Sequence, residues 1–325
     1  MSRLRLNPLT GRWVTISAER AARPSALAPR SLPVEAPPVD PCPFCPGHDE
    51  LTLPPIETYG PEGGDWQVRV VPNRYPAFSG TDPMVVRNLG PIFSEASASG
   101  LHEVLVLTQD HRASWADLDD KQAGVVMAAL RDRVEVHAAT AGIRYTQVIV
   151  NHGREAGASL DHPHAQLLGI PFVPQELTEE ENAFRRFVGG CLLCTTLEAE
   201  IEAGHRNVVE DDLVVAVCPF WSGVPYELLV IPRAHEGHLD HAKPADVAAT
   251  GRVLADVLRR LRDVVGEVAY NVVFHGQPVR HESPYHWHAH VFPRLTTRAG
   301  FEQGTGVLIN VVPPEQAAAD LRAAS

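Results

Sequence analysis

The chain contains long segments with apolar residues at helical spacing and short segments that are apolar throughout. Apolar residues recur three and four positions apart over residues 118–139 and 247–265, which predicts one principal helix in each segment. Residues 104–107 and 228–231 are short runs of valine, leucine and isoleucine, typical of buried strands. The pattern therefore predicts an α+β fold.

Two further strands are expected at residues 145–150 and 270–274. Each is followed by a glycine-containing loop and then by a run rich in histidine, at residues 162–166 and 286–290. Alternate side chains of a strand face the same side. If the runs are strands, the alternate polar residues of each one form a row on a single face of the sheet.

These features recur at a constant distance along the chain. His111 follows the first buried strand and His235 follows the second, so their separation is 235 − 111 = 124 residues. The histidine runs contain His162 and His286, and 286 − 162 is again 124. Each half also begins with a C-x-x-C pair. A constant offset between unlike motifs indicates an internal duplication.

The segment between the two copies has the composition of a junction. It contains Pro171, Pro174 and an acidic run at residues 179–181. A chain of 325 residues is also long enough for two domains. We therefore expect an N-terminal catalytic domain at residues 1–178 and a second domain of similar fold at residues 188–325.

Composition restricts the partners that the protein can have. The formal net charge of −12 and the pI near 5.7 oppose binding to nucleic acid or to an anionic membrane. No run of 18 apolar residues predicts a membrane span, and the five cysteines do not have the spacing of a disulfide framework. We expect a cytoplasmic protein whose small anionic substrate meets a local cluster of hydrogen-bond donors.

Each half contains four residues of the types that bind zinc. A C-x-x-C pair directs two thiolates to one point, and tetrahedral zinc needs two further ligands. The predicted ligands are Cys42, Cys45, His111 and His162 in the first half, and Cys191, Cys194, His235 and His286 in the second. Four protein ligands leave no position for an activated water, so both sites are predicted to be structural. The alternatives are unligated buried thiols or a redox C-x-x-C pair, and a redox pair would not explain the histidines.

The first histidine run also suggests a catalytic role. A neutral imidazole is a good nucleophile toward phosphorus, and the phosphoramidate that forms passes its group onward. We expect His164 to be this nucleophile and Gln166 to donate its amide to a phosphoryl oxygen. The glycine-containing loop at residues 153–159 offers backbone donors beside it. The alternative is that these histidines only pack in the fold or lie on its surface.

Several motifs of the chain resemble those of a known family. The resemblance is to the galactose-1-phosphate uridylyltransferases, a branch of the histidine-triad superfamily that also includes the ADP-glucose phosphorylases, and it covers nearly the whole chain. The motifs that carry it are Asn7–Trp13, Glu19–Pro24, Cys42–Cys45, Asn151–Gln166 and Trp287–His290.

The resemblance implies a fold, a reaction and a set of binding residues. It implies two histidine-triad-like halves, each a mostly antiparallel sheet with helices packed on it, in a homodimer. In the implied ping-pong reaction, His164 takes the uridylyl group from UDP-glucose and passes it to galactose 1-phosphate, which yields UDP-galactose. The residues that match nucleotide- and phosphate-binding positions are Arg20, Arg23, Asn73, Asn151, Ser159 and Gln166.

The segment at residues 299–306 resembles the phosphorylase branch more closely than the uridylyltransferase branch. Its Gly304 and Thr305 could bind either phosphate or a sugar phosphate. One alternative function is therefore a nucleotide-sugar phosphorylase, such as an ADP-glucose phosphorylase, or a dinucleotide hydrolase that uses the same His164. A second alternative is a zinc-stabilised nucleotide-binding protein without catalysis.

The second histidine run is a full histidine triad and permits two interpretations. His288 could be a second nucleophile. We favour the other interpretation, in which His288 and His290, together with His275 and Glu180, form an additional metal site or line the sugar-phosphate side of the active site.

Overall fold

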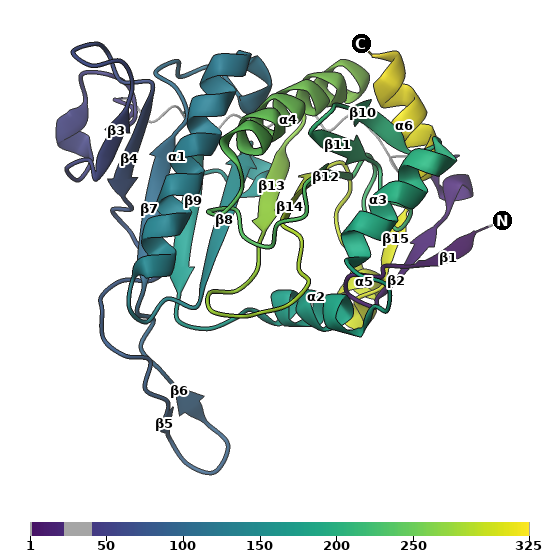
Figure 1. Cartoon of the computed structure of the whole chain (residues 1–325), viewed down its shortest axis with the longest axis horizontal. Helices are drawn as coiled ribbons and strands as arrows, with labels where there is room; N and C mark the ends of the chain where they lie inside the picture. The colour runs from purple at the N-terminus through teal and green to yellow at the C-terminus, as the bar shows by residue number, and fades with distance from the viewer. Residues whose placement is uncertain (1, 23–40, 325) are drawn as a thin grey trace.

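One ten-stranded antiparallel sheet forms the centre of the protein (Figure 1). The computed structural model describes residues 2–22 and 41–324. The strands of the sheet are β3 (Glu57–Tyr59), β4 (Val68–Pro72), β7 (Leu101–Val106), β8 (Tyr145–His152), β9 (His164–Ile170), β10 (Asn207–Glu210), β11 (Val214–Val217), β12 (Leu228–Pro232), β13 (Tyr270–His275) and β14 (His288–Pro293).

The strand order of the sheet repeats the duplication seen in the sequence. From one edge the order is β3-β4-β7-β9-β8, and from the other edge it is β10-β11-β12-β14-β13. The two sets meet where β8 pairs with β13. The predicted α+β fold of two tandem histidine-triad-like halves is therefore confirmed, and the halves share one continuous sheet. The domain boundary between residues 178 and 188 stays a prediction.

The two histidine runs are only partly in strands. β9 begins at His164 and β14 begins at His288, so His162 and His286 lie just before their strands. Proline at position 163 has no N–H for a sheet ladder, which explains the late start of β9. The expected row of alternate side chains therefore lies in a strand only from the second histidine of each run onward.

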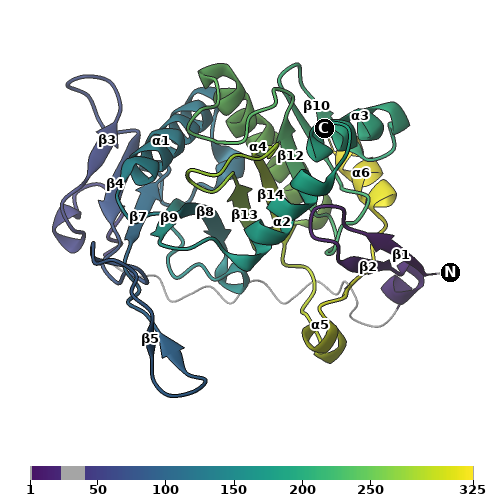
Figure 2. The ribbon, with the colours of Figure 1, turned by 60° about the horizontal axis from the view of Figure 1, so that its bottom comes forward.

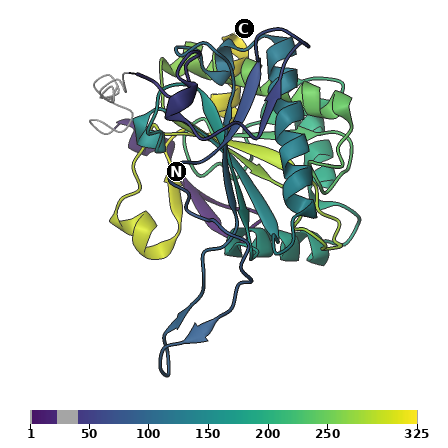
Figure 3. The same cartoon turned by 90° about the vertical axis from the view of Figure 1, so that its left-hand side faces the viewer.

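Two long helices cover one face of the sheet (Figure 3). They are α1 (Asp120–Ala139) and α4 (Pro244–Val265), close to the predicted segments. Asp119 caps α1 by accepting a hydrogen bond from the backbone N–H of Gln122, and Pro244 begins α4. The apolar side chains of both helices and of the sheet form one continuous core, which joins the two halves.

The remaining elements surround this core. A small sheet has the order β1-β2-β15, and it lies beside α6 and the segment that carries α5 (Figure 2). The bounds are β1 (Arg3–Leu6), β2 (Trp13–Ile16), β15 (Leu308–Asn310), α2 (Gln175–Arg186), α3 (Leu192–Ala203), α5 (Gly300–Thr305) and α6 (Pro314–Ala323), with short 3-10 helices η1 (Ala18–Ala22), η2 (Asp49–Leu51), η3 (Trp115–Asp117) and η4 (Arg154–Ala156). The hairpin of β5 (Arg87–Asn88) and β6 (Ser94–Glu95) projects away from the body (Figure 3).

No helix within residues 2–22 and 41–324 is both long and apolar enough to span a membrane.

Candidate active site

The face of the sheet opposite α1 and α4 carries the predicted catalytic residues. Ala165 and Leu167 of β9 belong to the core beneath the helices. Because side chains alternate along a strand, His164 and Gln166 face the other side. There they line a cavity of about 590 Å³, called here the His164 cavity. Its wall also includes Phe44 from the segment of the first C-x-x-C pair.

The geometry around His164 fixes which ring nitrogen can react. His164 Nδ1 lies 2.8 Å from the backbone oxygen of His162. A carbonyl oxygen only accepts, so Nδ1 carries the hydrogen and Nε2 keeps its lone pair. The side chain is 6% exposed, and burial lowers its pKa. His164 is therefore a neutral imidazole with Nε2 available as a nucleophile.

The side-chain amide of Gln166 is oriented by His102, a residue that the sequence analysis did not identify. The backbone N–H of Ala77 donates to His102 Nδ1 at 3.1 Å, so in the neutral ring Nε2 carries the hydrogen. His102 Nε2 lies 2.9 Å from Gln166 Oε1, to which it donates, and 3.1 Å from Asn73 Nδ2. This leaves the NH2 group of Gln166 as the free donor. Alternation along β7 from Val104, which lines the His164 cavity, was the signal that could have placed His102 on the same face.

The structure brings together only some of the other predicted binding residues. Asn73 and Ser159 line the His164 cavity. Asn151 lies one residue beyond the Val150–Ala165 pair of β8 and β9, which puts it beside His164. It lines a neighbouring cavity of about 590 Å³, called here the central cavity.

Three other predicted binding residues do not line the His164 cavity of their own chain. Arg20 lies in η1, and Gly304 and Thr305 lie in α5. The hydroxyl of Thr305 donates to the backbone oxygen of Phe301 at 2.7 Å. Arg23 lies outside the described residues.

The two predicted Cys2His2 sets each converge on one point. In each set the four ligand atoms lie within 4.8 Å of one another. Cys45 Sγ is 3.4 Å from His111 Nδ1 and 3.6 Å from His162 Nδ1. Tetrahedral coordination with the usual zinc–sulfur and zinc–nitrogen bond lengths places S and N about 3.6 Å apart. The side chains therefore have the geometry of a closed tetrahedral metal site.

The second set repeats this geometry. Cys194 Sγ is 3.4 Å from His286 Nδ1 and 3.7 Å from His235 Nδ1. In each set the far ring nitrogen of one histidine faces a main-chain oxygen: His162 Nε2 is 2.8 Å from Thr108 O, and His286 Nε2 is 2.9 Å from Pro232 O. These contacts fix the hydrogen on Nε2 and leave Nδ1 free to bind a metal ion.

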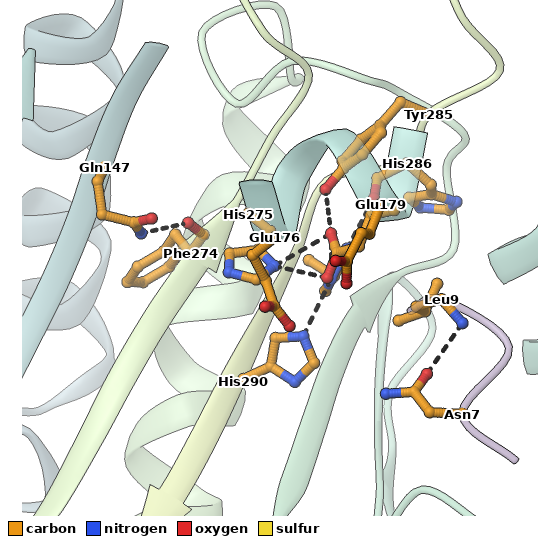
Figure 4. A network of polar contacts seen from close by, with 12 residues as sticks. Asn7, Leu9, Gln147, Glu176, Glu179, Phe274, His275, Tyr285, His286 and His290 are labelled. Carbon is orange, nitrogen blue, oxygen red and sulfur yellow. Dashed lines mark hydrogen bonds and ion pairs between the residues drawn. The ribbon is translucent and has the colours of Figure 1, made fainter. Parts of the chain in front are cut away.

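A third cluster lies on the catalytic face of the second half. It consists of Glu180, His275, His288 and His290, whose ligand atoms also lie within 4.8 Å of one another. His275 Nδ1 is 3.0 Å from a Glu180 oxygen, and the hydroxyl of Tyr285 donates to the same carboxylate. His275, Tyr285 and His290 converge around this point (Figure 4). His290 Nε2 faces the cluster, and its Nδ1 is buried without a hydrogen-bond partner among the described residues.

His288 repeats the geometry of His164 only in part. Its Nδ1 donates to the backbone oxygen of His286 at 2.8 Å, as His164 does to His162. Its Nε2, however, lies 3.2 Å from His290 Nε2, and the side chain is fully buried. The nitrogen that is free in His164 is enclosed in the third cluster in His288.

A buried neutral histidine with a free Nε2, on a strand of a duplicated antiparallel sheet, is arranged to attack phosphorus and to carry a nucleotidyl group. This defines the class of the protein as a nucleotidyltransferase of the histidine-triad superfamily.

Comparison with known proteins identifies the family. Residues 1–174 match the family model described as galactose-1-phosphate uridyl transferase, N-terminal domain, and residues 106–323 match one described as a domain of unknown function (DUF4921). The chain belongs to the galactose-1-phosphate uridyl transferase family, and the resemblance seen in its motifs is confirmed.

The chain is similar both to an ADP-glucose phosphorylase and to uridylyltransferases. The chain is 30% identical to an ADP-glucose phosphorylase of Arabidopsis thaliana, over 99% of this chain and 93% of the relative. It is also 30% identical to a galactose-1-phosphate uridylyltransferase of Thermotoga maritima, over 99% of this chain and 98% of the relative. A crystal structure of the Arabidopsis phosphorylase with bound ADP-glucose aligns with a TM-score of 0.84 and 29% identity, over 99% of this chain and 98% of that one. A structure of a uridylyltransferase aligns with a TM-score of 0.76 and 28% identity, over 100% of this chain and 98% of that one.

Proposed function

We propose that the protein is a UDP-glucose:hexose-1-phosphate uridylyltransferase that acts through a uridylyl-His164 intermediate. The observation that carries the proposal is the free Nε2 of a neutral His164, which lines a cavity of nucleotide size. The family membership and the several uridylyltransferase relatives support UDP-glucose as donor and galactose 1-phosphate as acceptor.

In the first step, the lone pair of His164 Nε2 attacks the α-phosphorus of UDP-glucose. The Nε2–P bond forms, the bond from this phosphorus to the bridging oxygen breaks, and glucose 1-phosphate leaves with the electron pair. In the second step, a phosphate oxygen of galactose 1-phosphate attacks the same phosphorus and His164 regains its lone pair. The NH2 group of Gln166 stabilises charge on the non-bridging oxygens during both steps.

Intact-mass analysis tests this mechanism directly. Wild-type protein incubated with UDP-glucose alone is expected to gain the mass of one uridylyl group, while His164→Gly gains none. The adduct should disappear when galactose 1-phosphate is added, with formation of UDP-galactose. An adduct that persists in His164→Gly would move the nucleophile to another residue, with His288 as the first candidate.

A second candidate function is the phosphorolysis of ADP-glucose. The higher TM-score of the Arabidopsis phosphorylase and the Ala299–Gly306 segment favour it. The same His164 would then carry an adenylyl group, and inorganic phosphate would be the acceptor. Parallel assays of UDP-glucose with galactose 1-phosphate and of ADP-glucose with phosphate separate the two. Turnover of the second pair alone would refute the uridylyltransferase assignment.

We also propose that zinc occupies both Cys2His2 sets. The sulfur and nitrogen donors and their spacing suit zinc, and bound zinc would anchor the segments that precede β9 and β14. Burial raises the pKa of Cys45 to about 11 and that of Cys194 to about 12 when no cation is present. A bound cation would therefore be needed to keep these thiols ionised at neutral pH. The cluster of Glu180, His275, His288 and His290 is proposed as a third metal site.

We further propose that the protein is a homodimer. Arg20, Gly304 and Thr305 do not line the His164 cavity of their own chain, and a second copy could supply them. The projecting hairpin also exposes apolar side chains that a partner could cover, namely Met84, Val85, Val86, Leu89, Ile92 and Phe93.

Subunit mixing tests the dimer proposal. His164→Gly and Arg20→Ala are each expected to be inactive, and a mixture allowed to exchange subunits should recover about a quarter of wild-type activity. Activity that never exceeds that of either variant would contradict a shared site.

A further inference from the structure

A network of three hydrogen bonds, built around Asn271 of the second half, reaches Asn151, a predicted binding residue of the first half. We propose that Asn271 and Arg294 are positioning residues, which hold the side-chain amide of Asn151 with its NH2 group directed at the bound nucleotide. The proposal rests on the proposed nucleotide-binding function of the site, and it assigns a role in that site to the second half.

The first bond fixes the orientation of Asn271. Arg294 Nε lies 2.6 Å from Asn271 Oδ1. A guanidinium group has no acceptor, so the atom of Asn271 that faces it must be the oxygen. The NH2 group of Asn271 therefore points the other way.

The next two bonds pass this orientation to Asn151. Asn271 Nδ2 donates to the backbone oxygen of Ala156 at 2.8 Å and to Asn151 Oδ1 at 2.7 Å. Since the backbone oxygen of Ala156 can only accept, it requires the same orientation of Asn271 that Arg294 does. Asn151 must then present its oxygen to Asn271, and its Nδ2 remains as a donor.

The free amide of Asn151 lies in the catalytic region. No described residue accepts a hydrogen bond from its Nδ2, and a Cβ built at Gly157 would lie 3.9 Å from this atom. Gly157 belongs to the loop that leads to His162 and His164. Asn151 itself lies beside His164 on the same face of the sheet, within reach of a nucleotide bonded to His164.

Turning the amide of Asn271 over would be costly. Asn271 is 6% exposed, and a turned amide would set its NH2 group against Arg294 and its oxygen against that of Ala156. Buried polar groups without partners are strongly disfavoured. The backbone of Arg294 is held by its N–H, which donates to the backbone oxygen of Ala269 at 2.8 Å. Only one orientation of the Asn151 and Asn271 amides therefore satisfies these three hydrogen bonds.

The pairing of β8 with β13 makes this connection possible. Asn151 and Asn271 are direct partners in that pair, which joins the two halves of the sheet. Asn151, Asn271 and Arg294 all line the central cavity, next to the His164 cavity. The second half therefore helps to determine which hydrogen-bond donors face the proposed nucleotide site.

The test compares Asn271→Leu and Asn271→Asp with wild type. The first removes the constraint without adding charge, and the second offers only acceptors, so that Asn151 turns its NH2 group away from the site. Affinities for UMP and AMP are measured by calorimetry, which needs no turnover. Each variant is expected to raise the Kd of the better-bound nucleotide by roughly 10- to 100-fold, as expected for a lost hydrogen bond to a ligand.

Two comparisons separate positioning from a general loss of stability. In an Asn151→Ala background, the Asn271 substitutions should cause no further loss of affinity, because they act through Asn151. Asn310→Asp is the matched control. Asn310 is a fully buried amide that donates to Ser222 O and Val224 O, and it lines neither cavity. This variant should lose stability and keep wild-type affinity.

The proposal is overturned if the Asn271 variants bind nucleotide as wild type does, or if their loss of affinity persists in the Asn151→Ala background. Binding of neither nucleotide by wild type would also overturn it, since Asn151 would have no ligand. Failure of the proposed function has a different signature. Wild type would bind nucleotide and show the Asn271 dependence, but it would form no nucleotidyl adduct with UDP-glucose or ADP-glucose.

Discussion

Gly251 permits the close contact between α1 and α4, and replacing it with alanine should force the two helices apart. A Cβ at this position would lie 2.6 Å from the backbone oxygen of Ala123 and 2.9 Å from Met127 Cγ. Ordinary C···O contacts are about 3.3–3.6 Å, so α4 would have to move by roughly 0.7 Å or more. The backbone oxygen of Gly251 also accepts a hydrogen bond from Trp115 Nε1 at 3.2 Å, which resists such a shift.

The magnitude follows from two opposing contributions. Alanine is more favourable than glycine in a helix interior by about 1 kcal/mol. Overpacking a well-packed core costs about 1–3 kcal/mol, and contact with a rigid backbone oxygen puts Gly251→Ala near the upper end. We expect a net decrease of about 1–2 kcal/mol in the free energy of unfolding.

Gly124→Ala is the matched control on the facing helix. A Cβ at Gly124 would lie 3.7 Å from the Cβ of Ala248, which is an ordinary contact. This variant should gain up to about 1 kcal/mol from helix propensity alone. Urea and thermal unfolding of both variants measure the difference, with a shift in Tm of roughly 2–4 °C per kcal/mol for a domain of this size. Equal or greater stability of Gly251→Ala would refute the argument from close helix packing.

Three further predictions concern pH, substrate positioning and metal content. Burial raises the pKa of Glu227 from an ordinary 4.5 to about 7, so the native state binds more protons than the unfolded chain between these values and loses stability as pH rises through them. Glu227→Gln should therefore raise the Tm at pH 8 and leave it unchanged at pH 4, and equal shifts at both pH values would contradict this. His102→Leu should slow formation of the nucleotidyl adduct by about tenfold, whereas His102→Gln retains a donor near Nε2 and should recover most of the rate. In a Gln166→Ala background, the loss caused by His102→Leu should vanish. Elemental analysis should find zinc in wild type, with one equivalent fewer in each of Cys42→Ser and Cys191→Ser. Wild-type zinc content in either variant would exclude that Cys2His2 set.

The sequence by itself determined the duplicated organisation and much of the site. The 124-residue offset, the positions of α1 and α4, and the strands β7, β8, β12 and β13 were all predicted from the sequence pattern. Periodicity and C-x-x-C spacing are local, so they can be recognised in short windows of sequence. The same holds for the two Cys2His2 sets, which the constant offset paired correctly before any contact was known.

Tertiary structure decided which of these segments meet. The halves join where β8 pairs with β13, and this pairing also brings Asn271 into contact with Asn151. The two asparagines are 271 − 151 = 120 residues apart in the chain, so no local pattern could predict their contact. The orientation of Gln166 depends on His102 in the same way, through the pairing of β7 with β9.

The fold also places only some of the predicted binding residues at the His164 cavity. Arg20 matches a binding position in sequence, and Gly304 and Thr305 were expected to bind phosphate or a sugar phosphate, yet none of the three lines the His164 cavity of its own chain. A motif shows which residue types a site requires. Which of these side chains lie close together, and which of their atoms donate or accept hydrogen bonds, is decided only when distant segments pack. The sequence therefore identified the candidate nucleophile, and the fold determined how the groups around it are oriented.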